Sequence, residues 1–169
     1  MRSARRRLAV LLALGAVVQP LTPGPGRAQA ALAPRPEIRL DATTDAAGTS
    51  LEGGVGVDVV AGTYLRLAAV AAGGRRLDGD GGGTARGELV GRFLFDPYRQ
   101  RRWGMYGFGG LATRWSQGPR RRWRGVVVVG LGAELPGSRA RRLAPALELG
   151  AAGGGRAGLV LRARRADRR

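Results

Sequence analysis

Cysteine, histidine, lysine and asparagine are absent from the 169-residue sequence. Without cysteine, the chain has no disulfide bond, no thiol nucleophile and no cysteine-ligated zinc. Without histidine, it has no imidazole base, no Ser-His-Asp triad and no histidine-ligated metal. We therefore expect no catalytic residue, no cofactor-binding residue, no metal site and no cofactor, and we expect that the protein is not an enzyme.

Every basic residue is arginine, and the 29 basic residues outnumber the 12 acidic ones to give a formal charge of +17. Glycine, with 30 residues, is about twice as frequent as in an average protein. A genome-wide composition bias produces the same pattern. The net charge is therefore not by itself an indication of a nucleic-acid partner.

The first thirty residues resemble an export sequence. Four arginines within 1–7 precede an apolar run at 8–18. As a helix this run would span about 16 Å, too short to cross a membrane core of about 30 Å. A small-residue motif, Ala28-Gln29-Ala30, follows. We predict a cleavable secretory signal peptide at 1–30, followed by a proline-rich segment at 31–36.

The rest of the chain alternates apolar and polar residues with a period of two, which is typical of β-strands. In one segment Leu89 and Phe93 share a face, while Glu88 and Arg92 share the other. Glycine, proline and arginine separate successive segments. We predict eight strands, at 37–45, 50–61, 63–73, 84–95, 103–115, 123–135, 143–152 and 156–165.

The alternation leaves open which face is buried. A soluble barrel buries its leucine and valine face, whereas a membrane barrel turns that face to lipid and its polar face to the lumen. Here the polar face carries mostly glycine and alanine, which suit a narrow lumen, and its isolated charges balance. We predict a luminal ion-pair network made by Arg39, Arg66, Arg86, Arg92, Arg124 and Arg162 with Asp41, Glu52, Asp58, Glu88, Glu134 and Glu148.

Aromatic residues near the strand ends also favour a membrane. Trp103 and Trp115 share a face and lie twelve residues apart, which for a tilted strand is about 30 Å. This separation matches two aromatic girdles flanking an apolar band. The residues that we assign to the membrane interfaces are Phe93, Phe95, Tyr98, Trp103, Trp115 and Trp123.

The segment at 103–115 fits the alternation less well than the others. Tyr106 and Phe108 fall on its luminal face, while Gly107 and Gly109 fall on its lipid face. A bulge near Gly109 and Gly110 would switch the register. Alternatively, the two rings fill space inside the barrel. The sequence leaves both interpretations open.

An export sequence followed by eight alternating strands resembles the small bacterial outer-membrane β-barrels of the OmpA/OmpX-like class, over about residues 37–165. The resemblance implies an all-β fold, an eight-stranded antiparallel up-and-down transmembrane β-barrel, with both termini in the periplasm. It places outer loops at about 46–49, 74–83, 116–122 and 153–155, and an ion-pair network inside. Barrels of this class usually end on an aromatic residue, whereas this sequence ends in a basic tail at 166–169.

We therefore expect a structural or envelope-maintenance protein of the bacterial outer membrane, with at most weak pore activity. The expected partners are the lipid bilayer and, for arginines in the connections, lipopolysaccharide phosphates. These arginines fall at opposite ends of the predicted barrel, so we expect no nucleic-acid partner, and we expect a monomer. The alternative is a secreted periplasmic, lipocalin-like β-barrel that binds an apolar ligand.

Overall fold

A computed structural model describes residues 34–46, 48–78, 81–98, 103–117, 122–136 and 143–163. The chain divides into two units, Met1–Ala31 and Leu32–Arg169, and all described residues belong to the second. The predicted signal peptide at 1–30 and the tail at 166–169 lie outside the described residues. In the described part of the chain, no helix is long and apolar enough to cross a membrane.

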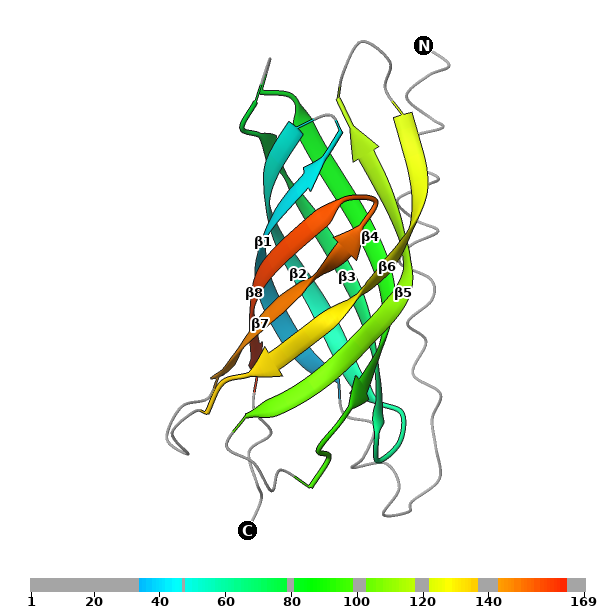
Figure 1. Ribbon diagram of the computed structural model, residues 1–169, viewed down its shortest axis with the longest axis vertical. Coiled ribbons are helices and arrows are strands. Elements are labelled where there is room, and N and C mark those ends of the chain that lie inside the picture. The colour runs from blue at the N-terminus through cyan, green and yellow to red at the C-terminus, as the bar shows by residue number, and fades with distance from the viewer. Residues whose placement is uncertain are drawn as a thin grey trace, which may run out of the picture. The chain divides into compact units, whose positions relative to one another are not determined.

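Eight strands form a closed antiparallel barrel in which each strand pairs with its neighbours in sequence and β1 pairs with β8 (Figure 1). The strands are β1 (Arg35–Asp45), β2 (Gly48–Val60), β3 (Leu65–Arg76), β4 (Gly83–Leu94), β5 (Gly104–Ser116), β6 (Arg122–Glu134), β7 (Leu143–Ala152) and β8 (Gly155–Ala163). The predicted fold class is confirmed. The strand limits differ from the predicted ones by a few residues: β1, for example, already begins at Arg35, inside the predicted proline-rich segment at 31–36.

The connections alternate between the two ends of the barrel (Figure 1). The turns after β1, β3, β5 and β7 lie at one end, which we call the mouth. The connections after β2, β4 and β6 lie at the other end, near the start of β1 and the end of β8. The β7–β8 hairpin is short, since its strands have 10 and 9 residues, and it reaches less far toward the mouth than the neighbouring hairpins.

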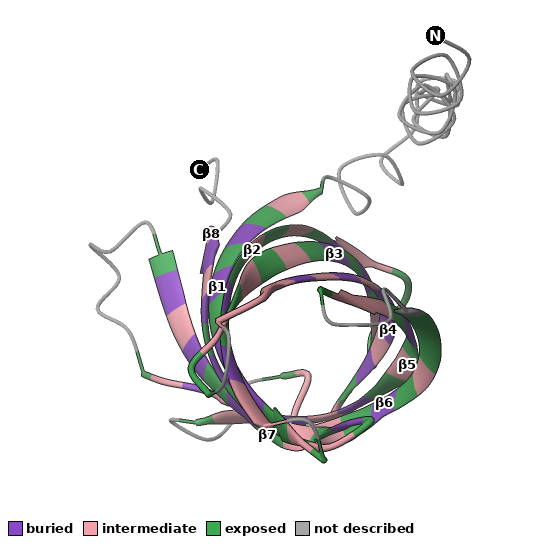
Figure 2. Ribbon diagram, turned by 90° about the horizontal axis from the view of Figure 1, so that it is seen from above, coloured by how far each residue is buried: buried purple, intermediate pink, exposed green. Residues whose placement is uncertain are grey.

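Burial alternates along most of each strand (Figure 2). Nearly all the buried positions hold charged, small or valine side chains, whereas the leucines and most of the valines lie outside. On β4, Leu89 is 69% exposed whereas Glu88 and Val90 on either side of it are buried. On β6, Val127 is 67% exposed and Val128 is fully buried. A soluble barrel would have the opposite arrangement. The barrel is therefore built to place its apolar face against lipid.

The β5 register runs without a bulge. Gly107, Gly109 and Gly110 each pair with one residue on β4 and one on β6. The rings of Tyr106 and Phe108 point inward and are almost fully buried. Of the two interpretations of this segment, the one in which the rings fill the interior is correct.

Candidate functional site

The interior of the barrel contains a network of ion pairs between inward-facing side chains. Within the described residues, eight arginines and eight carboxylates take part. The arginines are Arg35, Arg39, Arg66, Arg86, Arg92, Arg114, Arg156 and Arg162, and the carboxylates are Glu37, Asp41, Asp45, Glu52, Asp58, Glu88, Glu134 and Glu148. The two signs balance in number, which is the condition under which buried charges persist.

Glu148 of β7 lies at the centre of this network. Its Oε2 accepts hydrogen bonds from Arg39 Nη2 at 2.8 Å and from Arg156 Nη2 at 3.1 Å. Its Oε1 accepts from Arg162 Nη2 and from the Tyr106 hydroxyl, both at 2.8 Å. One carboxylate thus joins β7 to β1, β5 and β8.

Asp41 of β1 forms a second centre. Its Oδ2 accepts from Arg39 Nε at 2.7 Å and from Arg86 Nη2 at 2.5 Å, and its Oδ1 accepts from Arg156 Nε at 3.4 Å. Gly158 lies directly opposite on β8. A β-carbon at Gly158 would lie 2.2 Å from Asp41 Oδ1, so the glycine provides the room that this carboxylate occupies.

Glu37 holds the network together at the end opposite the mouth. Its two oxygens accept from Arg92 Nη1 and Nη2 at 2.8 and 2.9 Å, a bidentate pair, and Oε2 also accepts from Arg162 Nε at 3.1 Å. Bidentate arginine–carboxylate pairs are among the strongest ion pairs in proteins and have a fixed geometry. Arg66 extends the network to β3 through Glu134, at 3.1 Å.

Two aromatic rings pack among these charges. The Arg162 guanidinium lies over the Tyr106 ring, 5.0 Å from its centroid, and the Arg156 guanidinium lies over the Phe108 ring at 5.6 Å. Both distances are within the range of cation–π attraction. Arg162 also donates to the Tyr106 hydroxyl at 2.7 Å. The rings therefore fill space and hold two of the arginines in place.

The middle of the barrel is closed by these side chains. Arg92, Arg162 and Tyr106 are the largest of the side chains that are almost fully buried. In an open, water-filled lumen, long charged side chains would be accessible to solvent. The interior is therefore a packed polar core.

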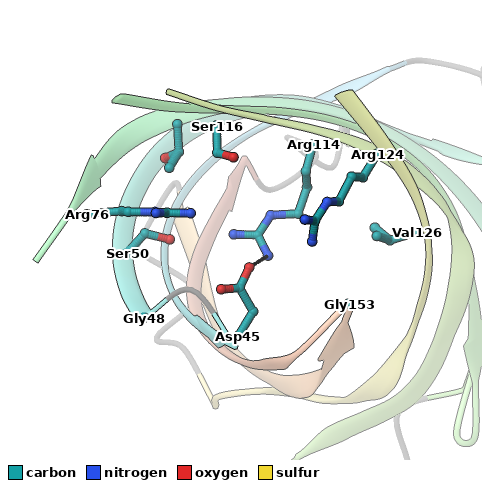
Figure 3. Close-up of a pocket in the computed structure, with 10 residues that line it drawn as sticks. Asp45, Gly48, Ser50, Arg76, Arg114, Ser116, Arg124, Val126 and Gly153 are labelled. Atoms are coloured by element: carbon teal, nitrogen blue, oxygen red, sulfur yellow. Dashed lines mark hydrogen bonds and ion pairs between the residues drawn. The ribbon is translucent and has the colours of Figure 1, made fainter. Parts of the chain in front are cut away.

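The mouth is less tightly filled and contains a cavity of ≈ 70 Å³. Three arginines from β3, β5 and β6 point into it, namely Arg76, Arg114 and Arg124 (Figure 3). Arg114 pairs with Asp45 through Nη1 and Oδ2 at 3.3 Å, and its Nη2 donates to Thr43 Oγ1 at 3.0 Å. The cavity lies at the mouth end of the ion-pair network.

Comparison with known proteins places the fold. No protein-family model and no curated protein sequence matches the chain. Among solved structures, it is similar to the N-terminal β-barrel domain of Pseudomonas aeruginosa OprF, with a TM-score of 0.56 and 15% identity over 77% of this chain and 95% of that one. It is also similar to Neisserial surface protein A (NspA), with a TM-score of 0.54 and 9% identity over 78% of this chain and 96% of that one.

The chain has the fold of these small eight-stranded barrels. The two solved barrels are each covered almost completely, so the likeness extends over the whole barrel and not over one hairpin. At such low identities the likeness concerns the fold alone.

Apart from Arg124, the residues predicted to form the luminal network lie inside the barrel and make ion pairs with one another. Arg124 differs from the prediction. It lies at the mouth and is exposed, and no ion pair involving it is found within the described residues. The ladder between β6 and β7 begins only at Val128, so Arg124 lies beyond the level at which β7 encloses the interior.

Sequence reasoning missed five charged residues of the network: Arg35 and Asp45, the two end residues of β1, and three more, Glu37, Arg114 and Arg156. Glu37 and Arg156 lay at the predicted limits of their strands, where the face was not assigned. Arg114 lay in the strand whose register was left open. Extending the alternation from Arg39, Arg162 and Phe108 by steps of two would have placed all three inside.

The predicted interface aromatics lie on the outer surface at both ends of the small-barrel fold. Trp115 and Trp123 are directly opposite each other in the β5–β6 ladder near the mouth. At the other end, Phe93 stacks on Tyr64 with ring centroids 5.8 Å apart, and Phe95 lies 6.3 Å from Phe93. Tyr98 and Trp103 are exposed at this same end. Tyr64, which lay at the start of the predicted strand 63–73 but just before β3 in the structure, was not among the predicted interface residues.

Proposed function

We propose that the protein is a non-enzymatic barrel of the bacterial outer membrane with a structural, envelope-maintenance role. The observation that carries this proposal is the apolar outer surface around a packed, charged interior. Exposed leucines and valines circle the barrel, while its buried side chains are largely charged. An apolar band facing outward and a polar interior are characteristic of outer-membrane-type barrels.

The closed interior supports a structural role in preference to transport. Glu148 and Asp41 each bind several arginines across the lumen, so a solute would have to break buried ion pairs in order to pass. Breaking such a pair costs about 3–5 kcal/mol. We infer at most weak pore activity.

A periplasmic barrel that carries an apolar ligand is the alternative function. Such a ligand would have to enter an interior lined by Arg39, Arg162 and Glu148, all of them buried. It would also leave exposed leucines facing water. Both requirements favour the membrane protein.

The proposed partners are the lipid bilayer and lipopolysaccharide phosphates, without nucleic acid, and we propose a monomer. A closed barrel has no strand edge that needs a partner chain, apart from the few residues of β6 beyond the β7 ladder. Most of the loop arginines assigned to lipopolysaccharide lie outside the described residues.

Cell fractionation tests the membrane location. We expect the protein in the outer-membrane fraction, with faster gel mobility before heating than after, because a folded barrel resists detergent until it is boiled. Recovery from the soluble periplasm, together with identical mobility before and after heating, would contradict the proposal.

Planar-bilayer recording tests the closed interior. We expect little or no steady conductance from the native protein, and a larger conductance from Tyr106→Ala, which removes a buried ring. Met105→Ala is the matched control because Met105 is the neighbouring residue and faces outward. A large conductance from the native protein, unchanged in Tyr106→Ala, would refute the closed interior.

A further inference from the structure

Three arginines lie side by side across the inner face near the mouth. Arg86 of β4 is directly opposite Arg114 of β5, and Arg114 is directly opposite Arg124 of β6. Like charges in directly opposed positions destabilise a sheet. This row therefore has a cost that the fold alone does not require.

Compensation by carboxylates decreases along this row. Arg86 contacts Asp41 at 2.5 Å and Glu88 at 3.2 Å. Arg114 contacts Asp45 at 3.3 Å and Glu52 at 3.7 Å. In the described part of the chain, neither an ion pair nor a side-chain hydrogen bond is found for Arg124. The positive charge is thus least balanced at the end of the row that lies at the mouth.

Arg76 adds a third guanidinium to the same cavity. It enters from β3, across the cavity from Arg114 and Arg124 (Figure 3). Its side chain, like that of Arg124, has no ion pair with any other described residue. Asp45 is the acidic residue lining the cavity, and it already contacts Arg114. Asp78 lies nearby at the rim, where it accepts a hydrogen bond from the Thr49 backbone N–H at 2.6 Å.

Hydroxyl groups complete the lining of the cavity. Ser50 and Ser116 line it together with Thr84. Thr84 is only 7% exposed, and its Oγ1 has no hydrogen-bond partner among the residues that the structure describes. A buried hydroxyl without a partner is destabilising, so a ligand that accepts a hydrogen bond from it would recover that free energy.

We propose that the mouth of the barrel binds a phosphate-type oxyanion between Arg76, Arg114 and Arg124, with the Thr84 hydroxyl as a further donor. Guanidinium groups pair with phosphate oxygens through parallel hydrogen bonds. The cavity of ≈ 70 Å³ exceeds the roughly 10–15 Å³ that one water needs. An oxyanion there would balance the positive charge of Arg114 and Arg124 and would also accept a hydrogen bond from the Thr84 hydroxyl.

The phosphate group has two sources, free phosphate and a lipid headgroup. The short β7–β8 hairpin makes one side of the barrel wall low at the mouth (Figure 1), and Gly153 of that hairpin lines the cavity. On the outer surface at this level lies Trp123, 70% exposed, and tryptophans of this kind mark the headgroup region. A lipid phosphate would therefore approach from the side, and a free phosphate from the open end.

Calorimetric titration with inorganic phosphate tests the site. The protein is placed in phosphatidylcholine nanodiscs at low ionic strength, with chloride at matched ionic strength as the reference anion. We expect saturable phosphate binding that Arg124→Gln and Arg76→Gln each weaken about tenfold or more. Arg75→Gln is the matched control, because Arg75 neighbours Arg76 but is exposed and does not line the cavity.

Thr84→Val separates a binding role from a structural one. Removing an unpartnered buried hydroxyl leaves the stability of the anion-free barrel unchanged or raises it, whereas phosphate binding is expected to fall several-fold. Unheated gel mobility confirms that each variant is folded. No saturable binding to the native protein, equal binding of chloride, or an equal loss in Arg75→Gln would overturn the proposal.

Nanodiscs containing phosphatidic acid distinguish the two sources. If a lipid headgroup occupies the site, the apparent affinity for inorganic phosphate falls in these discs for the native protein. If the site takes only the free anion, the affinity is the same in both kinds of disc. Either result supports the oxyanion site and assigns the origin of its ligand.

Discussion

Tyr106 of β5 lies directly opposite Gly132 of β6, and its ring occupies the space that a side chain on that glycine would need. A β-carbon on Gly132 would lie 2.2 Å from the ring carbon Cζ. Phe108 and Gly130 repeat the relationship one step along the same ladder, at 2.5 Å. Part of the high glycine content therefore serves to seat large side chains inside a narrow barrel.

Gly132→Ala is expected to destabilise the barrel by about 1–3 kcal/mol, because the added methyl group overpacks the Tyr106 ring. Denaturant unfolding in detergent micelles measures the change. Gly125→Ala on the same strand is the control, since nothing lies within 4 Å of its β-carbon position. An equal effect at both glycines would contradict the packing argument, and Tyr106→Ala should partly rescue Gly132→Ala.

Glu148→Gln is expected to cost about 3–5 kcal/mol of unfolding free energy, because it leaves Arg39, Arg156 and Arg162 without a shared carboxylate. The change is measured as the urea concentration at which half of the protein loses the faster gel mobility of the folded, unheated barrel. Asp78→Asn, at an exposed position on the rim, should alter stability by less than about 1 kcal/mol. A Glu148→Gln barrel as stable as the native one would mean that the network does not hold the strands together.

Leu89→Arg and Val129→Arg are each expected to impair insertion by about 2–4 kcal/mol, the cost of placing a charge on the lipid face near the bilayer midplane. Both residues lie in the middle of their strands and are exposed. Refolding yield into lipid vesicles measures the effect. Leu77→Arg, just beyond the mouth end of β3, should cost about 0–1 kcal/mol; equal and near-neutral results at all three positions would mean that the outer face does not contact lipid.

Tryptophan fluorescence tests the assignment of the girdles. In variants that retain Trp103 or Trp123 alone, we expect stronger quenching by lipids brominated near the headgroup than by lipids brominated near the chain ends. Each ring is at least half exposed on the outer surface. If either tryptophan were quenched most strongly by lipids brominated near the chain ends, it would not lie at the membrane interface, and the assignment of that girdle would be wrong.

Much of the fold follows from the period-two alternation. It located all eight strands, because along each of them the inward positions carry mostly charged or small residues and the outward positions mostly large apolar ones. It also identified the acidic centres Asp41 and Glu148 of the network. Because charges are scarce on the polar face, the sequence also predicted that this face points into the lumen and that the apolar face points outward.

What the alternation could not predict depends on neighbouring strands. Arg124 has the correct face for the network, yet β7 ends below its level, and nothing within 122–134 specifies where the partner strand ends. The rings of Tyr106 and Phe108 were ambiguous because the glycines that accommodate them lie on another strand. Strand alternation is a local property, whereas the enclosure of a side chain is set by residues far away in the sequence.

The pairing of β1 with β8 has a consequence for the order of folding. The ladder joins Glu37 to Arg162 and Thr44 to Gly155, residues separated by almost the whole barrel sequence, and contacts of such long separation form slowly. The bonds of Glu37 and Asp41 to Arg162 and Arg156 form across this same seam. Neutralisation of these interior charges is therefore tied to closure, so that a partly assembled barrel keeps charges exposed that only the completed cylinder can bury.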